Sequence, residues 1–183
     1  GMFQTKPDAN LGRSSQIFQV WLRPLRSNND AHFATRAALF ELDKLIKNGM
    51  SKKDFEATRN FLVNYVPQLV SSQDKQLGYA LDSEFYKTED FVSLVRNQLK
   101  SLTVEDINRV IKENLQTDDI QYVFISGDAK DMKKRLANET QSVLKYNSEK
   151  PADLLADDKI IQDYKLTIPS KDIEIIDVKD VFK

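Results

Sequence analysis

Cysteine is absent from the 183 residues, and histidine occurs once, as His32. The lack of cysteine excludes a disulfide framework, thiol catalysis and thiolate-bound metal clusters. A single histidine cannot supply the two imidazoles that a zinc site of the H-x-x-E-H kind requires. We therefore expect no catalytic residue, no metal ligand and no cofactor within this chain.

Glycine and proline are also scarce, with five residues of each. Their sum is about half of what is usual in globular proteins, which favours long helices and few tight turns. The charges nearly cancel, because 27 basic residues face 28 acidic ones, so nothing predicts a nucleic-acid partner. The longest uncharged run, residues 60–73, is too short and too polar for a membrane span. We expect a soluble protein of the periplasm or the cytoplasm.

Apolar residues repeat at three- and four-residue spacing through the middle of the chain, which predicts helices. The first runs from a cap at Asp30 to about residue 48, with Gly49 in the usual C-terminal position. A capping box, Ser51–Asp54, opens the second, and Pro67 predicts a kink near residues 63–66. Further helices are predicted over 75–85, after a cap at Thr88, after a capping box at 103–106, and over 128–138.

Three segments are predicted to be strands. Residues 14–25 alternate in polarity, residues 120–126 form an apolar run, and residues 172–175 alternate near the C-terminus. Together with the helices they predict an α+β fold, a small mainly antiparallel sheet with helices packed on one face. Residues 1–141 would form the domain, and residues 142–183 an extended tail that packs on it. Because the 120–125 strand has few neighbours in this chain, we expect it to pair with another polypeptide.

Neither of two polar features predicts chemistry. His32 follows the expected cap, and no nucleophile or carboxylate can be placed beside it, so we interpret it as a surface residue at a helix start. The basic triplet 133–135 is interpreted as a solvated helix face.

Two stretches carry a family resemblance: Phe55–Leu62 and Leu77–Tyr86. They resemble the C-terminal half-molecule of the insulinase/pitrilysin-type zinc metallopeptidases, which include the mitochondrial processing peptidase. Residues 41–55, 102–108 and 120–128 continue the series, and the tail from Pro151 is similar to bacterial members. The positions that match the family motif, as structural residues, are Arg59, Leu77, Gly78, Tyr79, Leu81, Asp82, Phe85 and Tyr86. Leu77, Leu81 and Phe85 share one helix face, which we predict to be buried packing.

The resemblance implies the later half of a non-catalytic C-terminal peptidase domain. In the family, zinc is bound by the catalytic domain through H-x-x-E-H, and the second domain holds substrate through L-R-x-x-x-x-L-x-Y; neither motif occurs here. The implied function is to wall the peptide-binding chamber of a zinc-dependent metalloendopeptidase and to pack on its catalytic domain. The chain alone would be inactive. Its partners would be the missing first half of the domain and the zinc-bearing domain, or a second copy in a self-dimer, with a peptide substrate in the full assembly.

A different class of function remains open at this point. The chain could be a stand-alone helical protein–protein interaction module or an assembly subunit without a proteolytic role. An H-x-x-E-H motif upstream in the same or an adjacent reading frame would favour the peptidase interpretation over this one.

Overall fold

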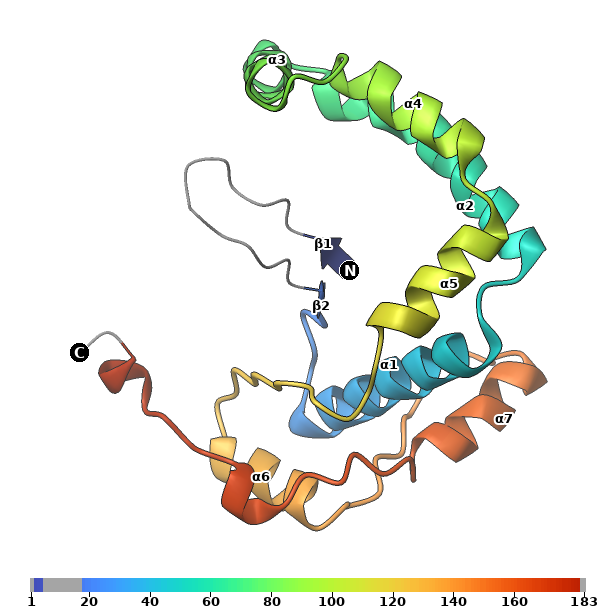
Figure 1. The fold of residues 1–183 in the computed structure, drawn as a ribbon. Coiled ribbons are helices and arrows are strands. Elements are labelled where there is room, and N and C mark those ends of the chain that lie inside the picture. Colours follow the sequence, from blue (N-terminus) through green and yellow to red (C-terminus); the bar gives the residue numbers. More distant parts are fainter. Residues whose placement is uncertain (1, 5–17, 182–183) are drawn as a thin grey trace. The chain divides into compact units, whose positions relative to one another are not determined.

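The computed structural model describes residues 2–4 and 18–181, most of which are helical. Two short strands, β1 and β2, pair with each other. Figure 1 shows the order of the elements. Their bounds are β1 (Met2–Gln4), β2 (Phe18–Val20), α1 (Asn28–Asn48), α2 (Lys52–Tyr65), η1 (Val66–Val70), α3 (Gln73–Tyr86), α4 (Phe91–Ser101), α5 (Val104–Asn114), α6 (Ala129–Ala137), α7 (Ala152–Ile161), η2 (Ser170–Asp172) and η3 (Val178–Asp180), where η denotes a 3-10 helix.

The predicted α+β fold, with a small mainly antiparallel sheet covered on one face, is wrong. Of the predicted strand 14–25, only β2 is a strand, and residues 14–17 lie outside the described residues. Residues 120–126 are not part of a strand ladder, and residues 172–175 begin in η2. A strand is stable only beside neighbours that take its hydrogen bonds, and the described part of the chain supplies none for residues 120–126.

Side-chain caps start the helices largely where the sequence predicts. The Ser51 hydroxyl accepts from the backbone N–H of Asp54 at 3.1 Å, and Thr103 and Asp106 form the predicted reciprocal capping box. Two caps differ from the prediction. Helix α1 is preceded by Ser27, whose hydroxyl accepts from the N–H of Asp30, and α4 is capped by Asp90 instead of Thr88.

The chain divides into two compact units, and residues 19–44 and 116–181 belong to the first. Its core contains apolar side chains of α1, α6 and α7, namely Phe33, Met132, Leu136 and Ile161. Polar side chains also join these helices: Asn28 on α1 donates to the carboxylate of Asp131 on α6 at 2.9 Å.

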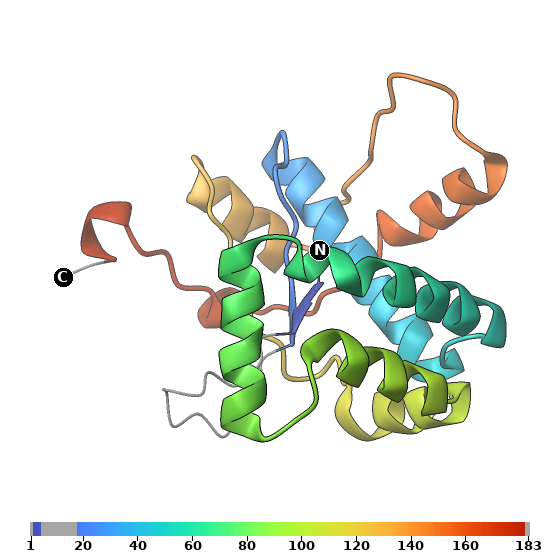
Figure 2. The ribbon, with the colours of Figure 1, turned by 90° about the horizontal axis from the view of Figure 1, so that it is seen from above.

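The second unit contains residues 45–115. Helix α2 ends at Tyr65 and the chain continues as η1, because Pro67 cannot extend the α-helical hydrogen bonding. This break corresponds to the predicted kink. Helices α2, α3 and α4 pack against η1, and Figure 2 shows them from above in cyan to green. The buried apolar side chains of this unit are Phe55, Val66, Leu99 and Ile111.

Helix α7 lies within residues 142–183, where the sequence pattern predicts only extended chain. Its apolar residues come as adjacent pairs, Leu154–Leu155 and Ile160–Ile161, so no three- or four-residue period marks it. Of these, only Ile161 is buried. None of the helices in the described residues is both long enough and apolar enough to cross a membrane.

Candidate functional site

The residues that carry the family resemblance do not gather into one site. Arg59, on α2, forms an ion pair with Glu56, and its guanidinium carbon lies 5.2 Å from the centroid of the Phe55 ring. The other motif residues lie on α3, where Tyr79 stacks on Phe91 with ring centroids 3.9 Å apart. Asp82 is half-buried and Gly78 borders open space, while Tyr86 contacts Phe85 edge to face.

The predicted burial along α3 is wrong. The side chains of Leu77, Leu81 and Phe85 are 62%, 61% and 62% exposed. Their four-residue spacing puts them on one side of the helix, and we call this set the α3 apolar face. An exposed apolar stripe of this length is unusual for an isolated chain and typical of a surface that binds another protein.

His32 is fully buried, so its interpretation as a surface residue is also wrong. Neither ring nitrogen has a hydrogen-bond partner among the described residues. Burial, together with the nearby charge of Arg36, lowers the pKa of His32 from 6.5 to about 4. The imidazole is therefore neutral at pH 7, and no carboxylate or hydroxyl orients it as a catalytic base requires. The described residues contain no group of three or more side chains that could bind a metal ion.

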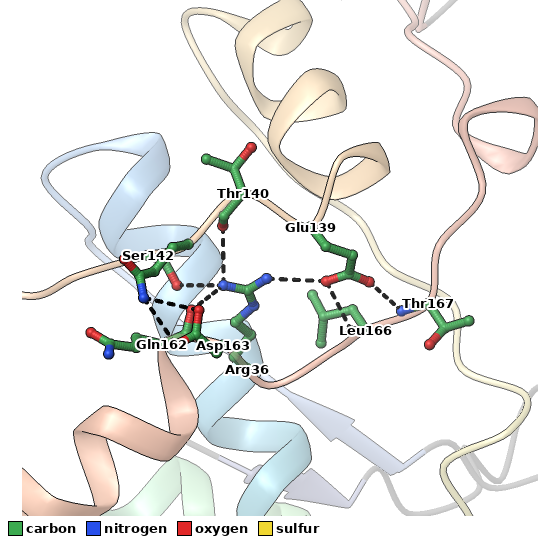
Figure 3. A network of polar contacts seen from close by, with 9 residues as sticks. Arg36, Glu139, Thr140, Ser142, Gln162, Asp163, Leu166 and Thr167 are labelled. Carbon is green, nitrogen blue, oxygen red and sulfur yellow. Dashed lines mark hydrogen bonds and ion pairs between the residues drawn. The ribbon is translucent and has the colours of Figure 1, made fainter.

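Arg36 lies one turn after His32, is fully buried and is the centre of a polar network (Figure 3). Its Nη1 donates to the carbonyl of Thr140 and to the hydroxyl of Ser142, both at 3.1 Å, and to the carbonyl of Gln162. Its Nη2 pairs with the carboxylate of Glu139 at 3.0 Å. The guanidinium cannot reach a ligand, so it acts as a structural tie between α1 and two segments that follow α6 and α7.

Glu139 occupies the position after α6 where glycine is usual. Its φ is 49°, and the backbone N–H groups of Glu139 and Thr140 close a Schellman motif on Leu136 and Arg135. The Glu139 carboxylate also accepts from the N–H of Thr167 at 2.7 Å. Arg36 and Glu139 together therefore fix residues 166–167, which border a groove.

These residues border a cavity of about 500 Å³, which we call the groove; it is lined by residues 117–118, 120–124, 166–169 and 172–173, together with Leu136. Hydrogen bonds from side chains of the first unit hold the segments that form both walls of the groove. Asp43 accepts from the hydroxyl of Thr117 at 3.1 Å and from the hydroxyl of Tyr164. Burial and the bond to Asp43 raise the pKa of Tyr164 to about 12. Lys133, predicted to lie on a solvated face, instead donates to the carbonyl of Ile173 at 2.6 Å.

One wall of the groove is strand-like. Exposure alternates along residues 120–125, with Tyr122 and Phe124 half-buried and stacked on one side. On the other side Val123 is 88% and Ile125 is 97% exposed. The backbone of residues 120–125 makes no hydrogen bond to any described residue. The groove thus offers unpaired peptide groups and apolar side chains, which suit binding of a polypeptide.

The chain matches no protein-family model, no curated protein and no solved structure. The resemblance to insulinase-type peptidases therefore stays a prediction that the sequence alone supports.

The sequence does not reveal the residues that hold the walls of the groove: Arg36, Asp43, Glu139 and Tyr164. A signal existed for Arg36, because residues 32, 36 and 40 share one face of a helix and two of the three are polar. The other three lie far apart in sequence, and no local pattern links them.

Proposed function

We propose that the chain is a non-catalytic domain, or a fragment of one, of a zinc-dependent metalloendopeptidase of the insulinase type. It walls the peptide-binding chamber and packs on the zinc-bearing catalytic domain. It has no catalytic role of its own, and zinc belongs to the other domain. Its partners are the first half of the same domain and the catalytic domain.

The observation that supports this proposal best is the α3 apolar face. It lies within Leu77–Tyr86, one of the two stretches that carry the family resemblance, and its three large side chains are more than half exposed. Exposing them costs free energy that a docked protein would recover, at about 25 cal/mol per Å² of apolar area covered. A domain built to pack on another domain accounts for the exposed face and for the family resemblance together.

The test is co-purification with the zinc-bearing domain of an insulinase-type peptidase from the same genome. We expect the chain alone to hydrolyse no peptide, and the two polypeptides to form a complex that does so in a chelator-sensitive manner. Leu81→Asp should prevent complex formation, because it places a charge in the α3 apolar face. Gln76→Asp is the matched control, since Gln76 is exposed on the same helix outside this face.

Two results would contradict the proposal. One is chelator-sensitive hydrolysis by the purified chain alone. The other is a complex that forms equally well with Leu81→Asp and with Gln76→Asp. Capture of a partner without peptidase activity would favour the alternative function, an interaction module without a proteolytic role.

A further inference from the structure

The strand-like wall of the groove is anchored at both ends to the same helix. At its start, Thr117 bonds to Asp43 of α1. At its end, the hydroxyl of Ser126 donates to the side-chain oxygen of Asn28, also on α1, at 2.7 Å. The amide nitrogen of Asn28 in turn donates to the carbonyl of Asp128 at 2.9 Å. Residues 120–125 are thus held in place although their own backbone groups are unpaired among the described residues.

The unpaired backbone groups of residues 120–125 indicate what kind of molecule can bind to this segment. N–H and C=O groups that alternate along an extended chain are matched by another extended chain, whose groups have the same spacing. The first unit covers one side of the segment, the side of Tyr122 and Phe124. Val123 and Ile125 are exposed on the other side, so apolar side chains at alternating positions of the added strand would pack against them.

The charges around the segment restrict the added strand further. Residues 120–127 contain no charged side chain, whereas Asp118 and Asp119 precede them and Asp128 follows. An antiparallel second copy would bring Asp118 or Asp119 of one chain close to Asp128 of the other. Like charges opposite each other destabilise a strand pair, so self-pairing is disfavoured and a strand with basic ends is favoured.

We propose that residues 120–125 receive an extended strand of another polypeptide, with apolar side chains at alternating positions and a basic residue at each end. This inference goes beyond the proposed function, because it names the chemistry of the binding partner and holds whether or not the parent protein is a peptidase. Its test uses neither zinc nor the catalytic domain, so the two proposals fail independently.

Hydrogen–deuterium exchange of the full chain measures the occupancy of the strand edge directly. In the free chain the amides of residues 121–125 should exchange rapidly at every protein concentration. The synthetic peptide KTVTVTVTVK should slow their exchange at least about tenfold, as new strand hydrogen bonds protect amides. The peptide ETVTVTVTVE, with acidic ends, should bind more weakly, and KTVTPTPTVK, which lacks two of the N–H donors, should give no protection.

A charge reversal on the chain tests the role of the acidic ends. The double variant Asp118→Lys with Asp119→Lys should weaken KTVTVTVTVK about fivefold or more and strengthen ETVTVTVTVE. The control, Glu105→Lys with Glu149→Lys, changes the net charge equally at residues that do not line the groove, and should leave both affinities unchanged.

The proposal is overturned if KTVTVTVTVK leaves the exchange of residues 121–125 unchanged. It is equally overturned if these amides are already protected in the free chain and the protection falls on dilution, because a second copy would then occupy the edge. Equal binding of the basic-ended and acidic-ended peptides would show that the acidic residues do not select the partner strand, and this would also overturn the proposal of a strand with basic ends.

Discussion

His32 and Arg36 place two basic side chains one helical turn apart in the core of the first unit. Arg36 is compensated by Glu139 and by three carbonyl or hydroxyl oxygens. His32 has no such compensation among the described residues. A buried charge without a counter-charge is costly, so the fold is compatible with His32 only in its neutral form.

This difference predicts acid sensitivity. The pKa of His32 is 6.5 when unfolded and about 4 when folded, so between these values the unfolded chain binds the additional proton. The free energy of unfolding should therefore be unaffected by this group above pH 6.5 and fall as pH drops from 6.5 to 4, by roughly 3 kcal/mol in total. Urea titrations of the native chain and of His32→Gln, at several pH values in this window, measure the effect.

In His32→Gln the titrating group is removed, so the decline over this window should be shallower than in the native chain. Identical pH slopes for the two proteins would show that His32 is not the group responsible.

The junction between α1 and α2 depends on one glycine. Gly49 has a φ of +70°, and a Cβ atom added there would lie 2.7 Å from Oδ1 of Asn108. That Asn108 side chain accepts from the N–H of Met50 at 2.7 Å and donates to its carbonyl at 3.1 Å. The side-chain amide of Asn108, on α5, thus satisfies the backbone N–H and C=O groups of Met50 at the turn.

We predict that Gly49→Ala destabilises the chain by about 1–2 kcal/mol from backbone strain alone, with a further loss from displacing Asn108. Gly78→Ala is the matched control, because Gly78 is helical and nothing lies within 4 Å of an added Cβ. It should stabilise the chain by about 0.5–1 kcal/mol. Thermal unfolding of both variants gives the comparison, and equal effects at the two glycines would refute the role assigned to Asn108.

Because the apolar side chains of α3 are exposed, truncating one of them should change the free energy of unfolding little. Leu81→Ala in the isolated chain should alter the free energy of unfolding by no more than about 0.5 kcal/mol, as is usual at exposed positions. Leu136→Ala should cost about 2–5 kcal/mol, because Leu136 is 3% exposed beneath the groove. Denaturant midpoints of the two variants, measured in parallel, test this prediction. A large loss of unfolding free energy for Leu81→Ala would show that its side chain is buried in a core.

At the scale of the whole molecule, exposed large hydrophobic side chains outnumber the buried ones in the described residues.

The sequence predicted helices and several of their caps correctly, since Ser51, Thr103 and Asp128 act on groups only a few residues away. It failed for the sheet, because pairing depends on distant segments, and the described residues supply none for residues 120–126. It failed for α3 as well, since the spacing of Leu77 and Leu81 reveals a shared face but not whether anything covers it.

The candidate site was only partly predictable for the same reason. The apolar character of residues 120–125 is visible in the sequence, but the strand that it predicted is not formed. The segments that line the groove are held by Asp43, Tyr164, Glu139 and Arg36, which are brought together by the packing of α1, α6 and the chain after α7.

The double anchoring of residues 117–126 has a geometric consequence. Asn28 and Asp43 lie on one helix, so at 1.5 Å per residue their Cα atoms are about 22 Å apart. The segment from Thr117 to Ser126 would span about 30 Å as a strand but only about 14 Å as a helix. Helix α1 is therefore a rigid strut that holds the two ends of the segment farther apart than a helix of the same number of residues would reach. A strand that binds there meets a segment whose two ends are already fixed, so association has less of the chain to order on this side.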